Sequence, residues 1–429
     1  MHAADPLQAR ERGYFTFRRS PKENGTAIIP HTMTTSPLAN VRVLDASRVL
    51  AGPFCGQLLG DLGAEVIKVE RPGSGDETRG WGPPFVGDLS AYFLSCNRNK
   101  KAVTLDLGQA DGLQLFYDLA KRSDVLLENF RAASADKLGV SPAKLHAQNP
   151  RLIVCSISGF GRTGPWSDLP GYDFAIQALS GLMSITGPAD GPPSKVGVAV
   201  TDVLTGLYAA VSVLACLHAR EQSGHGYAID LALLDCAIAA QVNVVQAYLS
   251  SGVMPARQGN AHLQIVPYQA FATQDEWLIL AVGNDGQWQR FCQAAQRPDL
   301  AGDARFITNT QRVEQRELLV PMIETLMKTR TGADWQEQLH AAEVPCAPVL
   351  DYPQLFALEQ ITARGMKVTV RDSAGKPIDL AGIPFHIGGA MLPAPQMPPR
   401  LGEHTDEILR EVLGLDAARI DALRQKRVI

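Results

Sequence analysis

One carboxylate is notable for its position in the chain. Asp202 lies between the extended stretch VGVAVT and a long apolar run that begins at Val203. An aspartate at this point most often serves as a helix N-cap, because its side chain accepts hydrogen bonds from free backbone N–H groups. The same position also suits a nucleophile, since a helix dipole favours an ionised carboxylate at an exposed strand–helix junction. The residues alone favour the capping role and leave the catalytic one open.

Basic side chains cluster near the early apolar runs, and several follow the ends of predicted strands, where doubly wound sheets bind ligands. A phosphate-bearing small molecule is therefore possible, beside the ordinary role of solvated surface charge. The net charge of −4, from 40 basic and 44 acidic residues, gives no global field that would attract nucleic acid. The cluster consists of Arg71, Arg79, Arg98, Lys100, Lys101 and Lys137.

Other familiar chemistries have little support. GFGRTG (159–164) matches a dinucleotide fingerprint, but Pro165 follows it instead of a helix. The chain has no CxxC, HExxH or GxSxG motif, so we expect no metal site and no serine nucleophile elbow. The seven scattered cysteines are typical of free thiols in a reducing compartment.

The elements that must position these residues alternate in type. Short apolar runs at 41–47, 64–70, 101–107, 124–130 and 152–159 alternate with amphipathic stretches at 53–63, 109–122 and 142–149. This alternation predicts a parallel sheet covered by helices on both faces, a Rossmann-like α/β domain. Apolar helices are expected at 203–219 and 233–249, and a smaller α/β unit between about 260 and 345.

Residues 1–40 lack a sustained period and mix basic with acidic side chains. We expect a disordered extension, or translation from Met33, with mitochondrial import as the less favoured interpretation. The longest uncharged apolar stretch, 203–219, is shorter than the roughly 20 residues that span a bilayer, so no membrane association is expected.

These motifs together resemble the class III CoA-transferases from about residue 41 to the end. Stretches similar to the succinyl-CoA:glutarate (dicarboxylate) branch include ERPGSGDETRGWGPPFVG (70–87), SGLMSITGPADGPP (180–193) and IVPYQAF (265–271). The ordered family motifs are VLDASRVLAGPFCGQLLGDLGAEVIKVERPGSGDETRGW (43–81), CNRNKKAVTLDL (96–107), DVLLENFR (124–131), SGFGRTGP (158–165), GVAVTDVLTGLYA (197–209) and LGEHTDEILREVLG (401–414).

The resemblance assigns Asp202 as the catalytic nucleophile, which would pass through an aspartyl mixed anhydride and an aspartyl-CoA thioester. CoA thioesters would be substrates, and neither a permanently bound cofactor nor a metal is implied. Backbone N–H donors should lie near Asp202 to stabilise the developing oxyanions. By position in the family, the CoA-binding residues would be Val49, Ala51, Arg71, Leu105, Asn129, Phe130, Lys137 and Leu138.

Departures from the family pattern bear on the substrate. Leu50 stands where formyl and oxalyl members have Gln, and Asp173 where they have Glu. Leu50 and the short QGNAH stretch (258–262) favour an acceptor acid longer than oxalate. If this acceptor is a dicarboxylate, its distal carboxylate would need a cation in the protein. Candidates for that cation are Arg48, Arg257 and His262.

Two other functions remain open. An α-methylacyl-CoA racemase would share the fold, but those enzymes carry His where this chain has Tyr172, so one of two catalytic groups is missing. A non-catalytic acyl-CoA-binding protein would need no nucleophile.

The family implies an interlocked homodimer. Its large CoA-binding domain would comprise 41–225 and 345–429, with linker helices and a small domain at 226–344. We expect the cytoplasm, or the mitochondrial matrix if 1–40 is a transit peptide.

Overall fold

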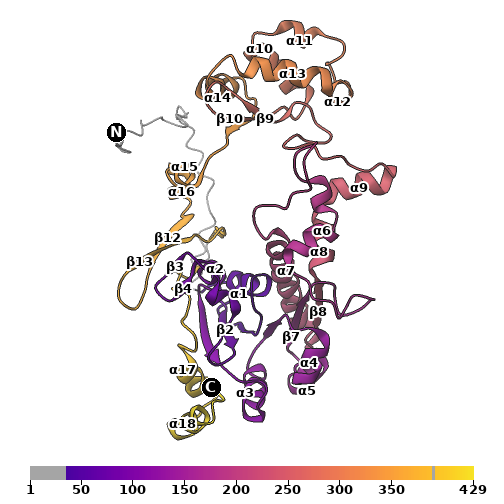
Figure 1. The fold of residues 1–429 in the computed structure, drawn as a ribbon. Coiled ribbons are helices and arrows are strands. Elements are labelled where there is room, and N and C mark those ends of the chain that lie inside the picture. Colours follow the sequence, from indigo (N-terminus) through magenta and orange to yellow (C-terminus); the bar gives the residue numbers. More distant parts are fainter. Residues whose placement is uncertain (1–34, 389–391) are drawn as a thin grey trace, which may run out of the picture. The chain divides into compact units, whose positions relative to one another are not determined.

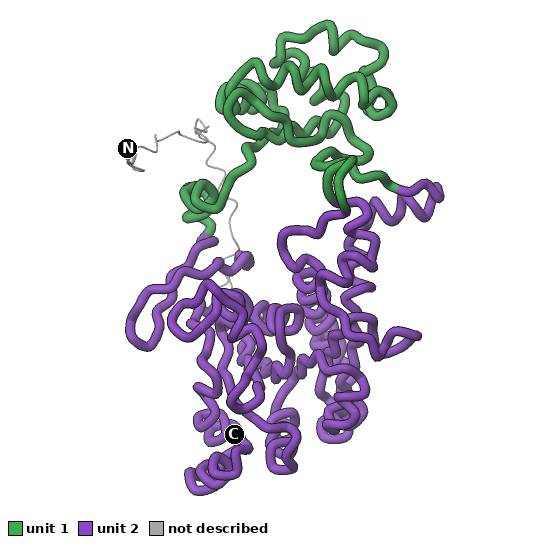
Figure 2. The backbone as a smooth tube through the Cα atoms, viewed as in Figure 1, with its two compact units in different colours: residues 1–26, 187–192, 255–364 green, residues 27–186, 193–254, 365–429 purple. Residues whose placement is uncertain are grey.

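The computed structural model describes residues 35–388 and 392–429, so most of the predicted N-terminal extension lies outside the described residues. The described chain forms two compact units, coloured separately in Figure 2. The smaller unit comprises Gly187–Pro192 and Pro255–Arg364, and the larger contains most of the rest. Residues 226–254 therefore belong with the larger unit, and the smaller unit extends beyond 344 to Arg364. Leu38 packs on the core, so the folded part begins before residue 41.

The larger unit is built on a six-stranded, all-parallel sheet in the order β5-β2-β1-β6-β7-β8. The chain runs outward from β1 to β5 on one side and then crosses to β6 on the other, so the switch point lies between β1 and β6. The six strands of this sheet are β1 (Arg42–Asp45), β2 (Glu65–Glu70), β5 (Lys100–Thr104), β6 (Val125–Glu128), β7 (Ile153–Ser158) and β8 (Ala228–Ala232). Two separate two-stranded sheets of the larger unit pair β3 (Phe85–Val86) with β4 (Leu89–Ser90) and β12 (Lys367–Arg371) with β13 (Pro377–Ala381).

Helices cover both faces of this sheet (Figure 1). Alternate strand residues enter opposite cores: Val43 packs with α1 and α7, whereas Leu44 packs with α3, α17 and α18. The helices of the larger unit are α1 (Ala51–Asp61), α2 (Ala91–Cys96), α3 (Ala110–Ala120), α4 (Ala132–Leu138), α5 (Pro142–Gln148), α6 (Asp173–Leu179), α7 (Val200–Ser223), α8 (Leu233–Ala240), α9 (Val242–Ser251), α17 (Thr405–Glu411) and α18 (Ala417–Gln425), with short 3-10 turns at Glu77–Gly80 and Leu182–Ile185.

The smaller unit has its own core around Trp288 and Trp335, behind a three-stranded antiparallel sheet in the order β11-β10-β9. Its elements are β9 (Tyr268–Ala272), β10 (Trp277–Ala281), β11 (Cys346–Pro348), α10 (Asp285–Ala294), α11 (Pro298–Gly302), α12 (Asn309–Glu314), α13 (Arg316–Met327), α14 (Gly332–Ala341), α15 (Tyr352–Phe356) and α16 (Glu359–Ala363).

Two apolar helices differ from the sequence prediction. The predicted helix 233–249 is two helices, α8 and α9, bent by 79° at the break between them. Helix α7 begins at Val200, three residues earlier than the apolar run. Its 24 residues are, by length and composition alone, enough to cross a membrane, although 39% of its most apolar window is buried inside the structure. Its buried face packs on α1 and the sheet.

Candidate active site

A pocket of about 370 Å³ lies in the larger unit where strand ends meet helix starts. Arg48, Val49, Leu50 and Ala51 line it from the β1–α1 connection. Residues 129–131, directly after β6, line it as well, as do residues after β7 and the start of α8. This is the switch point between β1 and β6, where a doubly wound sheet binds its ligand.

Asp202 lines this pocket from the first turn of α7. Within residues 35–388 and 392–429, no hydrogen bond or ion pair engages its side chain. Burial, reinforced by the negative charge of Asp173, raises the pKa of Asp202 to about 7. Burial therefore opposes the ionisation that the helix dipole would favour. An unpaired, desolvated carboxylate facing a cavity has the properties of a nucleophile.

Asp202 is not the N-cap of its helix. The cap residue of α7 is Ala199, and the capping carboxylate comes from α6: Asp173 Oδ1 accepts hydrogen bonds from Thr201 N (2.8 Å) and Thr201 Oγ1 (2.7 Å). Gln177 donates to Asp173 Oδ2 at 2.7 Å. Asp173 thus satisfies the helix end and leaves Asp202 free, which the sequence did not show.

Residue Asn129 fixes the β1–α1 connection. Its Oδ1 accepts from Arg48 N at 3.0 Å, and its Nδ2 donates to Arg48 O at 2.9 Å, an exchange that holds the backbone of the pocket wall. The guanidinium of Arg48 forms an ion pair with Glu77, another lining residue. Arg48 is therefore already partnered in this structure.

The pocket includes many of the predicted ligand-binding residues and excludes others. Leu105 is 1% exposed and belongs to the core behind the sheet, so its side chain is closed to a ligand here. Arg71 and Lys137 are exposed outside the pocket lining, and Leu138 packs against the core. Predicted residues that line the pocket are Arg48, Val49, Leu50, Ala51, Asn129, Phe130, Tyr172 and Asp202.

Two predicted acid-binding residues belong to the smaller unit and have partners inside it. Arg257 donates to the carbonyl oxygens of Pro188 (3.2 Å) and Gly191 (2.7 Å). Nδ1 of His262 accepts from Gln264 N at 3.0 Å, so this ring nitrogen is occupied.

The structure changes the interpretation of the basic cluster. Arg79 pairs with Glu70 (2.6 Å), and Arg98 is paired with Asp61. Lys100 and Lys101 are also paired, Lys100 with Asp45 and Lys101 with Glu407, whereas Arg71 and Lys137 are exposed. Four of the six cations therefore pair with carboxylates of the protein and are not available for phosphates.

A cation that the sequence reasoning missed is Arg131, which is exposed and lines the pocket. It follows Phe130 at the carboxyl end of β6, and this position after a strand was the signal that could have identified it. Ser134, in the first turn of α4, also lines the pocket.

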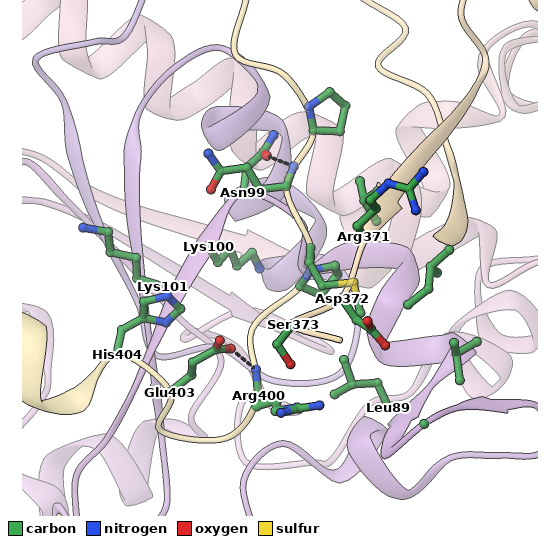
Figure 3. Close-up of a pocket in the computed structure, with 18 of the residues that line it drawn as sticks. Leu89, Asn99, Lys100, Lys101, Arg371, Asp372, Ser373, Arg400, Glu403 and His404 are labelled. Atoms are coloured by element: carbon green, nitrogen blue, oxygen red, sulfur yellow. Dashed lines mark hydrogen bonds between the residues drawn. The ribbon is translucent and has the colours of Figure 1, made fainter. Parts of the chain in front are cut away.

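A second cavity, of about 700 Å³, lies between β5, the β12–β13 hairpin and the segment before α17 (Figure 3). Its cations are already engaged: Lys101 with Glu407 at 2.7 Å and Arg400 with Asp88 at 3.5 Å. It contains no unpaired carboxylate comparable to Asp202, and within the described chain no cluster of His, Cys, Asp and Glu could hold a metal ion. The smaller pocket is therefore the better candidate for catalysis.

Comparison with known proteins gives the family. The profile of CoA-transferase family III matches residues 38–405. The chain belongs to this family. It is 41% identical over 382 residues to the succinate–glutarate CoA-transferase of Agrobacterium fabrum, covering 88% of this chain and 96% of that protein. It is 38% identical over 393 residues to the human succinyl-CoA:glutarate CoA-transferase, covering 92% and 90%.

Solved structures of family members agree with the fold. A CAIB/BAIF family protein from Brucella suis superposes with a TM-score of 0.78 at 41% identity, covering 88% of this chain and all of that one. The D175A mutant of Rv3272 from Mycobacterium tuberculosis has a TM-score of 0.77 at 30% identity, covering 87% and 98%. The chain is thus a CoA-transferase with the α/β fold and large parallel sheet expected for the family, as the sequence predicted.

Proposed function

We propose that this enzyme transfers CoA from succinyl-CoA to a dicarboxylate such as glutarate, with Asp202 as the nucleophile. The observation that carries the proposal is the unpaired carboxylate of Asp202 in a pocket at the β1/β6 switch point. Relatives named for succinyl-CoA and glutarate, similar along nearly their whole length, support the choice of substrates.

The reaction follows from the chemistry of a carboxylate facing a thioester. Ionised Asp202 attacks the thioester carbon of succinyl-CoA, giving a mixed anhydride and the CoA thiolate. The thiolate attacks the aspartyl carbonyl, which releases succinate and leaves an aspartyl-CoA thioester. The acceptor carboxylate attacks this thioester to form a second anhydride. The returning thiolate then attacks the acceptor carbonyl and frees Asp202. Acyl activation is conserved throughout, provided that water is excluded.

Each attack places negative charge on a carbonyl oxygen, and the first turn of α1 offers N–H groups beside the pocket. This helix begins at Ala51 and lacks a side-chain cap within the described chain. The first N–H groups of a helix have no intrahelical acceptor, so those of Ala51 and Gly52 are suited to an oxyanion or a phosphate.

Trapping of the thioester tests the proposal. Wild type incubated with succinyl-CoA should carry a CoA-sized adduct in intact-protein mass spectrometry, located on the Asp202 peptide and removed by hydroxylamine. The Asp202→Asn variant, similar in shape but not nucleophilic, should carry none. Glu77→Gln is the matched control, because Glu77 is another carboxylate in the pocket lining. An adduct that persists in Asp202→Asn would refute the assignment. Clear CoA binding without any adduct would favour a racemase or a binding protein, and α-proton exchange would then be measured.

We also propose that two copies of the chain assemble as the interlocked homodimer typical of the family. The larger unit exposes many large apolar side chains on α6, α7 and α9, an unusual amount for a monomer surface. Examples are Phe174 (59% exposed), Val211 (65%) and Leu249 (69%). A stable folded monomer in analytical ultracentrifugation at low concentration would contradict this assembly.

The compartment proposed is the cytoplasm. All seven cysteines are free thiols, which fits a reducing environment. Localisation of a fluorescent fusion of the full chain tests this, and import into mitochondria would overturn it.

A further inference from the structure

The pocket wall contains a strained residue. Val49 has φ of 72°, in the left-handed region that a β-branched residue rarely adopts. Glycine would adopt this conformation at little cost. Val49 immediately precedes Leu50 and Ala51, the start of α1, so its conformation sets where the first turn of that helix lies. A strained backbone persists only where neighbouring groups hold it.

A buried ion pair holds the Val49 backbone. Both side-chain oxygens of Asp76 accept from Val49 N at 3.3 Å. Lys68 Nζ donates to Asp76 Oδ2 at 2.9 Å and to Ser47 O at 3.0 Å. Thr78 steadies the same carboxylate through its backbone N–H (3.0 Å) and hydroxyl (2.8 Å). Lys68 and Asp76 therefore form hydrogen bonds with the backbone of the β1–α1 connection on both sides of Arg48.

Both members of the pair are charged although neither side chain is exposed. Burial alone would lower the pKa of Lys68, but the Asp76, Asp45 and Glu70 carboxylates outweigh it, so the pKa lies above its usual range. Burial would raise the pKa of Asp76, but Lys68 and the hydrogen bonds from Thr78 keep it low. A buried ion pair is often no more stabilising than apolar residues of similar volume, so stability alone does not account for it.

A second buried pair holds the other end of the same connection. Lys100 Nζ donates to Asp45 Oδ2 at 2.9 Å and to Pro53 O at 2.7 Å. Asp45 Oδ1 accepts from Ser47 N at 3.1 Å. Two buried lysine–aspartate pairs thus form hydrogen bonds with the backbone between Ser47 and Pro53. Within the same segment, residues 48–51 line the pocket.

We propose that Lys68 and Asp76 are positioning residues that hold Val49 in its strained conformation and so place the N-terminal turn of α1 for CoA. The inference rests on the proposed function, because it assigns CoA to this pocket. Neither residue of the pair lines the pocket. The pair preorganises the first turn of α1 before CoA binds. Binding then does not incur the conformational entropy cost of ordering a mobile loop.

A double-mutant cycle tests this role, with CoA binding measured by calorimetry. Asp76→Asn should raise the Kd for CoA about tenfold or more, because a charged acceptor is lost. In the Val49→Gly background the same substitution should raise it less than about threefold, since glycine needs no support at positive φ. If Asp76→Asn raises the Kd for CoA equally in the wild-type and Val49→Gly backgrounds, the proposal is overturned and the ion pair has only a general structural role. Val49→Gly alone should not lower the unfolding midpoint, and a marked fall would show that Val49 is not strained.

Controls separate positioning from loss of folding. Asp61 and Arg98 form another buried ion pair, at the far end of α1. The double variant Asp61→Asn/Arg98→Met should keep the Kd for CoA within about twofold, and a loss as large as that of Asp76→Asn would overturn the proposal. If Asp76→Asn unfolds because Lys68 is left unpaired, Lys68→Met/Asp76→Asn removes both charges and replaces it in the cycle. Failure of wild type to bind CoA would refute the proposed function itself, whereas unchanged binding in Asp76→Asn would refute only this inference.

Discussion

Replacing the proposed nucleophile, Asp202, should stabilise the protein. Asp202→Asn removes a carboxylate that the fold makes costly to ionise, since burial and then Asp173 raise its pKa from 3.8 to about 7. We therefore expect the variant to lose CoA transfer and to gain free energy of unfolding at neutral and alkaline pH. Such a gain in the free energy of unfolding is expected where a group needed for catalysis destabilises the folded protein.

The sign and the pH window follow from proton linkage. Below pH 3.8 the carboxyl is protonated in both the folded and the unfolded chain, so Asp202 does not alter the free energy of unfolding. As the pH rises from there to about 7, the unfolded chain releases the proton while the folded chain retains it, so stability falls. Above about 7 the loss is complete and amounts to at most about 4 kcal/mol, at 1.36 kcal/mol per pKa unit.

The assay is thermal unfolding of wild type and Asp202→Asn across this range, at equal protein concentration. At about pH 8 the variant should melt several degrees higher, since each kcal/mol moves Tm by roughly 2–4 °C in domains of 150–250 residues. At about pH 4 the two midpoints should nearly coincide. Glu337→Gln, at an exposed carboxylate of α14, should give no such pH-dependent gain. Equal midpoints at pH 8, or a less stable variant, would refute the raised pKa and with it the desolvated site.

Three further predictions concern the pocket. Asp173→Asn should move the acidic limb of kcat/KM to lower pH, because the like charge that raises the pKa of Asp202 is gone while Thr201 keeps an acceptor. Arg131→Ala should raise KM for succinyl-CoA roughly ten- to a hundredfold and change KM for glutarate little, because we expect this exposed cation to make a charge-assisted contact with a phosphate of CoA. Gly52→Ala should weaken CoA binding, because a Cβ there would lie 2.3 Å from the Oγ of Ser47 and displace the pocket wall.

Each of these predictions has an outcome that would contradict it, and the last two have a matched control variant. An acidic limb unmoved in Asp173→Asn would show that burial alone sets the pKa of Asp202. Lys144→Ala, at an exposed cation on α5, should leave both KM values unchanged, so a similar rise there would make the Arg131 effect nonspecific. Gly302→Ala meets nothing within 4 Å and should bind CoA normally. Normal binding by Gly52→Ala as well would refute the tight contact under α1.

The sheet was predictable because its signal is local. Short apolar-rich runs such as 64–70 and 124–130 indicate strands, and helices between them indicate parallel pairing. The edge strand β8 lacked that signal, since its residues are only partly buried over most of its length. The sequence also did not predict the bend between α8 and α9. An apolar stretch at 233–249 predicts a buried helix, but it carries no signal for a change in the direction of the helix axis.

Ion pairing was not predictable, because it joins residues far apart in the chain. Lys100 meets Asp45 across 55 positions, and Arg98 meets Asp61 across 37. Composition shows that charges balance, yet only the sheet order determines which carboxylate neutralises which cation. The sequence therefore indicated a basic cluster between Arg71 and Lys137, whereas the structure leaves the exposed cation Arg131, which was not among the predicted residues, at the pocket.

The role of Asp202 depends on its neighbour Asp173 as well as on its own place in the chain. Its place before an apolar helix was visible in the sequence, but that place is shared by ordinary capping aspartates. The distinction came from Asp173, which takes over the capping bonds from another helix and adds a negative charge nearby. One carboxylate satisfies the helix so that the other remains unpaired, and we expect the same arrangement to lower the free energy of unfolding. Under the proposed function, catalysis and instability at this site would have a single physical origin, so the stability of Asp202→Asn is informative about catalysis.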